Sequence, residues 1–401
     1  MTSRRLAFAS REFRLFWSAR FLFLASHYAL AVVIAQYVYE RTHRPLDLGF
    51  IGLAVFLPRF LLALVAGQVA DRFDRRHVVL MCRATHLAAL CALFLAHLGG
   101  PIPLPVIYTF LAVTGAVIAF DGSASMAIVP QLVPADHFTN AVTWNSSAIQ
   151  LAMVLGPAFG GWLYGFGGLT SAFVVTIVMR CISVLCIASM RTRTEKLDAS
   201  PASWATLMAG VHYVVKNRLI LGAISLDLFA VLLGGAVALL PVYANDVLDV
   251  GAKGLGVLRA APSIGAVAMS LLLARYPIRR DTGQKMLWCV AIFGLATVGF
   301  GLSQHFFLSL FFLAVLGAAD MVSMVVRGVL VQMETPHHMR GRVSAVNFVF
   351  IGASNDLGEF ESGITAHWFG TVPAVVLGGV GTLLVVALWA KKFPEIRRYS
   401  S

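Results

Sequence analysis

Long apolar runs alternate with short polar stretches along the whole chain. A helix needs about 20 consecutive apolar residues to cross a bilayer, and twelve runs are long enough. We predict membrane-spanning helices at residues 15–39, 48–70, 77–97, 104–128, 140–164, 167–190, 219–245, 254–274, 285–303, 306–328, 342–367 and 371–391. Proline and glycine lie between these runs, as Gly165, Gly167 and Gly168 do after the fifth, where a turn is required. The pattern therefore predicts an all-α membrane protein.

The longest polar stretch, RTRTEKLDASPAS and its flanks, lies near the middle of the chain at residues 191–217. It separates six predicted spans from six. We therefore expect an N-terminal six-helix bundle at residues 1–190, a cytoplasmic linker, and a C-terminal six-helix bundle at residues 218–401. Within the linker, residues 202–215 have the pattern of a short amphipathic helix that lies along the membrane surface.

Residue matches between the two halves indicate an internal repeat. A shift of 204 residues places Gly52 on Gly256 and Pro58 on Pro262, and further matches occur at a shift of 202. Several matches at about half the chain length rarely arise by chance, even in a glycine-rich sequence. Transporters built from two parallel repeats bind their substrate between the halves.

Composition supports a membrane protein and narrows the function. Of 401 residues, 59% are apolar and 12% are charged, whereas soluble domains have about a quarter of their residues charged. This excludes a soluble enzyme, a disulfide-stapled secreted domain and a disordered chain. The five cysteines lie inside apolar runs without a CxxC pair or a histidine at metal spacing, so we expect them only to pack, and we expect no metal and no cofactor.

The net charge of +12 indicates topology and not nucleic-acid binding, because lysine and arginine cluster in alternate loops between apolar runs. The opposite loops hold only Arg41, Arg44 and Lys253. By the positive-inside rule both termini are cytoplasmic, which requires an even number of spans.

The loop after the second predicted span has the sequence GQVADRFDRR at residues 67–76. It resembles the signature loop of the major facilitator superfamily, G-x-L-a-D-R-x-G-R-R, from which Val69 and Asp74 depart. The DRFDRR variant is similar to that of the enterobactin-exporter and macrolide-efflux branch, as are GLGVLRAAPSIGA around Arg259 and TPHHMRGRVSAVN around Arg340. The resemblance covers the whole chain and implies the twelve-helix major facilitator fold of two pseudo-symmetric bundles.

The fifth predicted span has the sequence AMVLGPAFGG at residues 152–161, which is similar to the antiporter motif of the superfamily. Glycine at this spacing lets another helix approach closely, and proline releases a backbone hydrogen bond. A hinge or seal between the halves is one interpretation, and tight helix packing alone is the other. The residues concerned are Gly156, Pro157, Gly160 and Gly161.

Asp71 ends the second span on the cytoplasmic side, where it is expected to pair with Arg340 or Arg342 of the opposite half and so close a cytoplasmic gate. The alternative is that Asp71, Arg75 and Arg76 are solvated loop charges that only set the topology. The gate residues predicted are Gly67, Asp71, Arg72, Arg75, Arg76, Arg340 and Arg342.

Charged groups within lipid-spanning helices are expensive and are candidates for function. The resemblance implies that spans one, four, seven and ten line the cavity. The predicted set for substrate binding and proton coupling is Arg20, His27, Arg59, Asp121, Asp227, Asp320, Arg327, Asp356 and Glu359. Arg83 and Arg180 are expected to be structural pairs or to snorkel. A fixed ion pair of Asp320 with Arg327, or of Asp356 with Arg59, is the alternative for those two carboxylates.

These features predict a secondary transporter of the bacterial inner membrane, monomeric in the lipid bilayer, that exports a bulky drug or siderophore-like small molecule in exchange for protons. A carboxylate among Asp320, Asp356 and Glu359 would carry the proton. The fourth span lacks the arginine of the R-x-x-Q-G motif found in many proton-coupled antiporters, which leaves the proton carrier open. An uptake symporter and a lysophospholipid transporter are alternatives. A non-transporting sensor or an intramembrane enzyme is the remote one. No GxxxxGK[ST] loop occurs, so a gradient and not ATP drives transport.

Overall fold

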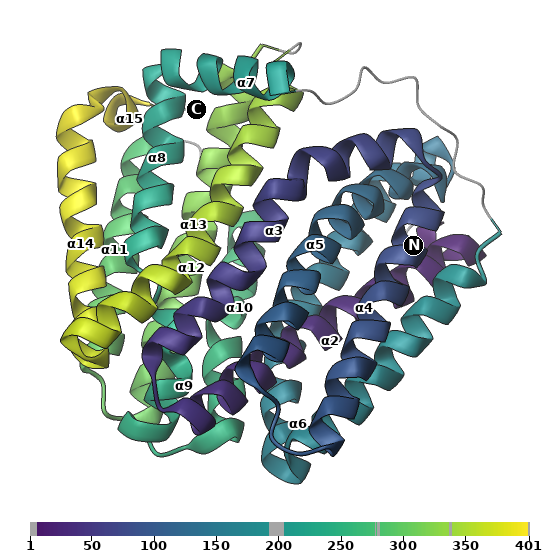
Figure 1. The fold of residues 1–401 in the computed structure, drawn as a ribbon. Coiled ribbons are helices and arrows are strands. Elements are labelled where there is room, and N and C mark those ends of the chain that lie inside the picture. The colour runs from purple at the N-terminus through teal and green to yellow at the C-terminus, as the bar shows by residue number, and fades with distance from the viewer. Residues whose placement is uncertain (1–5, 192–203, 277, 279–280, 337–338, 400–401) are drawn as a thin grey trace. The chain divides into compact units, whose positions relative to one another are not determined.

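The computed structural model describes residues 6–191, 204–276, 278, 281–336 and 339–399, and all regular structure in them is helical (Figure 1). The α-helices are α1 (Leu6–Ala9), α2 (Arg11–Thr42), α3 (Pro45–Arg72), α4 (Arg75–Leu98), α5 (Leu104–Ile128), α6 (Phe138–Ala188), α7 (Trp204–Lys216), α8 (Arg218–Leu233), α9 (Leu240–Val242), α10 (Gly251–Arg275), α11 (Thr282–Leu302), α12 (Phe306–Glu334), α13 (Arg340–Phe369), α14 (Thr371–Lys392) and α15 (Pro394–Arg398). Short 3₁₀ or π turns are η1 (Val129–Gln131), η2 (Ala135–His137), η3 (Ala236–Leu239) and η4 (Tyr243–Val247).

Ten helical segments in the described part of the chain are long and apolar enough to cross a membrane. One of them, α6, has 51 residues, about 77 Å at 1.5 Å per residue. Its backbone is not helical at Gly167 and Gly168, so α6 consists of two helices joined where the sequence predicted a turn. Helix α13 has 30 residues but is not among the ten. Polar residues such as Asn355 and Asp356 interrupt its apolar run. The all-helical membrane fold is confirmed, whereas the number twelve and the cytoplasmic termini stay predictions.

The chain divides into two compact units, and each is described by itself. Unit 1 comprises Met1–Tyr37 and Ala54–Ala202, and unit 2 comprises Val38–Leu53 and Ser203–Ser401. The boundary near residue 202 lies within the predicted linker. The predicted domain limits did not anticipate that the end of α2 and the start of α3 group with the C-terminal helices.

In unit 1, α4 packs on α5 and α6, and two glycines bring α6 against α2. A Cβ atom added to Gly156 would lie 2.7 Å from Tyr28 Cβ, and one added to Gly160 would lie 2.7 Å from Ala29 Cα. Two glycines of the antiporter-like motif therefore serve tight helix packing within unit 1. A hinge role for this motif stays a prediction.

Replacing Gly160 with alanine is expected to destabilise the protein by about 1–3 kcal/mol, because the new methyl group would meet backbone atoms of Ala29 that cannot rotate away. The matched control is Gly122→Ala, where a Cβ would meet nothing within 4 Å and helix propensity favours alanine. Thermal unfolding in detergent would check the pair. Equal midpoints for the two variants would contradict the packing role.

In unit 2, α10 and α11 pack on α12, α11 packs on α14, and α8 packs on α13 and α14. Helix α7 occupies the predicted amphipathic segment. Its Val214 is buried in the unit core, Val215 is exposed, and the Tyr213 hydroxyl donates to the Glu334 carbonyl at 3.1 Å. A helix is thus present in the predicted segment, and it packs on α13 and α8.

The seventh predicted span is broken. Helix α8 ends before Gly234, and the chain continues through η3, α9 and η4. A Cβ atom at Gly235 would lie 2.6 Å from Ser362 Oγ and 2.7 Å from the Gly358 carbonyl oxygen. The glycine therefore lets α13 approach the break closely.

The segment Val38–Leu53 packs on the other helices of unit 2 through small residues. A Cβ at Gly49 would lie 3.1 Å from the Phe360 carbonyl oxygen and 3.2 Å from Gly363 Cα. Nearby, the Tyr39 hydroxyl donates a hydrogen bond to the Asp246 carboxylate. These contacts explain why residues 38–53 group with the C-terminal helices.

Candidate functional site

Polar side chains from three helices, and a backbone carbonyl from a fourth, meet in the core of unit 1. Arg83 of α4 donates from Nε to Asp121 Oδ1 of α5 at 3.0 Å and from Nη1 to Ser183 Oγ of α6 at 3.0 Å. Ser183 in turn donates to the Ala19 carbonyl of α2 at 2.8 Å, and Ser125 donates to Asp121 Oδ2 at 3.2 Å. The Arg83–Asp121 ion pair is almost completely buried, so it joins the helices of unit 1 at their centre.

A second arginine lies in the same core. Arg180 of α6 bonds through Nη1 to His86 Nδ1, and His86 Nε2 lies 2.8 Å from Thr114 Oγ1. Because a guanidinium has no acceptor, His86 Nδ1 accepts and the ring is the neutral Nε2–H tautomer. The Thr114 hydroxyl donates a hydrogen bond to the Phe110 carbonyl. The Thr114 oxygen can therefore accept a hydrogen bond from His86 Nε2.

Phe23 of α2 lies against both of these arginines. The Cζ atoms of Arg83 and Arg180 are each 4.9 Å from the centre of its ring, within cation–π range. Arg83 and Arg180 therefore both have partners within unit 1, and a purely structural role for them stays a prediction. His86 was not among the predicted residues, although it lies three residues after Arg83 and thus on the same helix face.

The remaining predicted residues of unit 1 lie around this core. Arg20 is buried and interacts electrostatically with Asp121 and Arg83. His27 contacts the ring of Tyr28 and lies within electrostatic range of His86. Arg59 lies within electrostatic range of Tyr28. Their predicted roles in substrate binding stay predictions.

In unit 2, Arg327 of α12 forms a buried ion pair with Asp227 of α8. The alternative that Arg327 holds Asp320 is therefore wrong. Within the described residues, no hydrogen bond or ion pair is found for Asp320. This leaves Asp320, which is half-buried, as a carboxylate beside an ion pair that is already complete.

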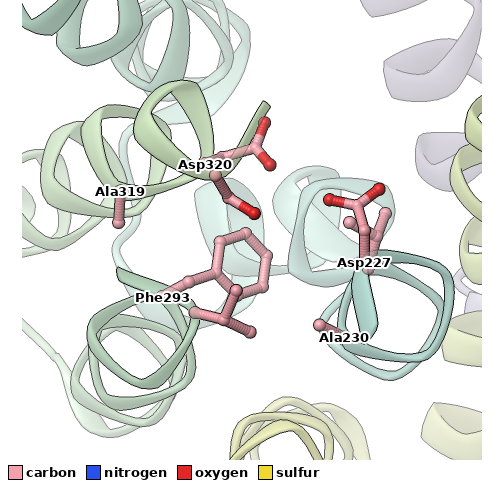
Figure 2. A pocket seen from close by; sticks show the side chains of 8 residues that line it. Asp227, Ala230, Phe293, Ala319 and Asp320 are labelled. Carbon is pink, nitrogen blue, oxygen red and sulfur yellow. The ribbon is translucent and has the colours of Figure 1, made fainter. Parts of the chain in front are cut away.

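Asp227 and Asp320 line one small pocket of unit 2. Its other lining residues are Ala230, Val231, Val290, Phe293, Ala319 and Ser323. Figure 2 shows the two carboxylates arriving from different helices, with the Phe293 ring beside them. The cavity volume is about 10 Å³, close to the minimum for one water molecule. A single water there would have polar partners on both sides.

Helix α13 carries the other two predicted carboxylates. Glu359 lies 3.5 Å from Arg259 Nη2 of α10, and Asp356 is one turn earlier. A Cβ atom added to Gly52 would lie 2.8 Å from both the Asp356 carbonyl oxygen and Glu359 Cβ. Gly52 thus lets the start of α3 pack directly on this acidic turn.

The arginines of the loop motif bind helix ends. Arg75 is buried and donates to the Ala70 and Ala127 carbonyls at 3.3 and 3.1 Å. Arg76 donates to the Ile187 and Ala188 carbonyls at 3.1 and 2.7 Å. Both cations therefore satisfy carbonyl groups at the ends of neighbouring helices, where positive charge is favourable. The alternative of a solvated loop charge is therefore wrong for Arg75, whereas for the partly exposed Arg76 it stays a prediction.

The predicted cytoplasmic gate stays a prediction. The side chain of Asp71 lies outside the described residues, Gly67 is within α3, and Arg72 is exposed. At the other end, Arg340 donates to the Thr335 carbonyl at 3.1 Å, and Arg342 is exposed.

Comparisons with known proteins give the family. The family model described as "Transmembrane secretion effector" matches residues 3–399. The enterobactin exporter EntS of Shigella boydii serotype 18 is 24% identical over 387 residues, which cover 96% of this chain and 93% of that protein. EntS of Shigella boydii serotype 4 is 25% identical over 390 residues, with the same shares.

Solved structures share the fold. A bacterial homolog of the human lysosomal transporter Spinster aligns with a TM-score of 0.77 at 13% identity, covering 97% of this chain and 98% of that one. The nucleoside transporter NupG aligns with a TM-score of 0.75 at 12% identity, covering 95% and 100%. These likenesses extend over both units.

Proposed function

Because this chain belongs to the transmembrane secretion effector family of the major facilitator superfamily, a family of multi-pass membrane transporters of small molecules, we propose that it exports a bulky small molecule from the cytoplasm in exchange for protons. The membrane would be the bacterial inner membrane, and the working unit a monomer. Export is supported by the names of its relatives, and by the antiporter-like motif of α6. The cargo we propose is a drug or a siderophore-like metabolite.

The observation that supports proton exchange is the pocket of Asp227 and Asp320. A carboxylate that is partly buried, without an ion-pair partner and next to room for a water is suited to gain and lose a proton. Asp227 lacks this freedom because Arg327 holds it. We therefore propose Asp320 as the residue that carries the transported proton, with Asp356 and Glu359 as the next candidates.

In the proposed cycle, Asp320 loses its proton to the cytoplasm as cargo binds from that side. After the transporter opens outward, a proton from outside neutralises Asp320 and cargo leaves. Return to the inward state carries the proton in. Each proton gains about 2.3 kcal/mol per 100 mV of membrane potential, so one proton per cycle supports a substantial concentration gradient of cargo.

Everted membrane vesicles that respire test this function, because their interior becomes acidic. Addition of a transported compound should release part of the pH gradient, seen as recovery of a quenched acridine dye. Vesicles without the protein are the control. If no compound in a panel of drugs and siderophores shifts the dye, and the same panel shows no efflux from intact cells, the proposed export is wrong.

Topology gives a second test. We expect Cys introduced at Arg44 to react with an impermeant maleimide in intact cells, and Cys at Arg398 to react only after the membrane is opened. Both positions are exposed, and the background would lack the five native cysteines. The reverse labelling order would place the termini outside and would reverse the direction of the proposed cycle.

A further inference from the structure

The core of unit 1 contains arginine nitrogens without partners. Arg20 Nε and Nη1, Arg83 Nη2, and Arg180 Nε and Nη2 are buried and have no hydrogen-bond partner within the described residues. Buried donors are nearly always satisfied, by protein or by bound molecules. Five open donors on three neighbouring guanidinium groups therefore indicate a ligand that accepts hydrogen bonds.

The charges of this cluster do not balance. Arg20, Arg83 and Arg180 contribute three positive charges, and within the described residues Asp121 is the one carboxylate that acts electrostatically on Arg20 and Arg180. His86 adds no charge, because its Nδ1 accepts from Arg180. An uncompensated positive charge at the centre of a lipid-spanning bundle is expensive. Purely structural pairing would not retain three arginines for one aspartate.

Exposure shows which arginine a ligand would meet first. Arg20 and Asp121 keep 8% and 6% of their surface exposed, whereas Arg83 and Arg180 keep 1%. Arg20 also lies 5.9 Å from the centre of the Phe16 ring. Phe16 is itself completely buried, so Arg20 is the arginine of the cluster that a ligand would contact first.

We propose that this cluster, Arg20 with Arg83 and Arg180 behind it, binds an oxyanion of the cargo, a carboxylate or a phosphate, so that the exported compound is an organic anion. The planar fork of arginine matches both groups and binds them in bidentate fashion. This inference rests on the proposed function and adds the chemical class of its cargo.

The binding test uses the purified full chain in detergent, without any gradient. Salicylate and inorganic phosphate are the anionic probes, and salicylamide is the neutral counterpart of salicylate. We expect salicylate or phosphate to raise the unfolding midpoint and salicylamide to leave it unchanged, because a ligand that binds only the folded state stabilises it. In Arg20→Gln the apparent Kd should rise at least about tenfold, and in Arg20→Lys by less, since charge remains but the fork is lost.

The matched control is Arg11→Gln, which removes the same charge from an exposed position of the same helix and should bind like wild type. Stability separates a binding role from a structural one. Without any probe, Arg20→Gln should unfold no lower than wild type, because it removes an unbalanced charge. Arg83→Gln should unfold lower, because Asp121 loses its partner.

The proposal is overturned if neither probe stabilises the wild-type protein, if Arg20→Gln binds the probes as tightly as wild type, or if Arg20→Gln by itself unfolds well below wild type. These results do not depend on transport. Dye recovery in everted vesicles with uncharged or cationic compounds alone would leave export intact and exclude an anionic cargo. Probe binding through Arg20 without transport of any compound would instead overturn export.

Discussion

Replacing Asp121 with asparagine is expected to destabilise the protein by about 3–5 kcal/mol, the cost of leaving a buried charge without its partner. Asp121 accepts from Arg83 at 3.0 Å, and its negative charge also acts on Arg20 and Arg180. Its loss therefore leaves three arginines uncompensated, whereas loss of Arg83 still leaves two cations near Asp121. The aspartate variant should be the less stable of the two.

The loss of stability would be measured by heating the protein in detergent and monitoring its unfolding by size-exclusion chromatography. Asp136→Asn is the control, because it removes the same charge from an exposed position of unit 1. A double variant, Arg83→Met with Asp121→Leu, sharpens the test. Full recovery of stability would show that Asp121 balances Arg83 alone, and would contradict the view that it serves the whole cluster.

Replacing Asp320 with asparagine is expected to abolish transport against a gradient while leaving the protein folded. The amide cannot gain and lose a proton at this position, so substrate movement is no longer coupled to proton entry. Because Asp320 has no ion-pair partner among the described residues, its replacement leaves no charge uncompensated. Asp227→Asn, in contrast, should destabilise unit 2 because it strands Arg327 in a buried position.

The measurement separates coupling from binding. In vesicles, Asp320→Asn should still exchange labelled for unlabelled substrate across the membrane, but should not accumulate it. Ser323→Ala, a change in the same pocket lining, should retain accumulation. If Asp320→Asn accumulates substrate at the wild-type rate, the proton lies elsewhere, and Asp356 and Glu359 on α13 become the candidates.

Hydropathy was sufficient for the helical fold, because crossing a bilayer imposes length and apolar composition on each segment separately. The turn within α6 was predicted from Gly167 and Gly168, and it is where the backbone departs from a helix. The broken end of the seventh span was not predicted. At this break Gly235 packs closely against α13, a contact between segments far apart in sequence that the hydropathy pattern does not reveal.

Ion pairing could not be predicted in the same way. Asp320 and Arg327 share a face of α12, but seven residues rise about 10.5 Å along a helix, too far for a direct ion pair. Arg327 instead pairs with Asp227 of α8, about one hundred residues earlier in the chain. Helices that are apolar on every side do not indicate which face meets which neighbour. For the same reason the sequence pattern could not predict the Arg83–Asp121 ion pair.

The placement of residues 38–53 in unit 2 has a consequence for how the chain is assembled during synthesis. The Tyr39 hydroxyl and Gly49 emerge from the ribosome long before Asp246 and Gly363, the groups that they contact. Until those later helices are inserted, the first hairpin has no partner for this surface. The N-terminal half therefore completes its packing only after the last third of the chain has been made, so a fragment that ends at the linker would lack part of its own fold.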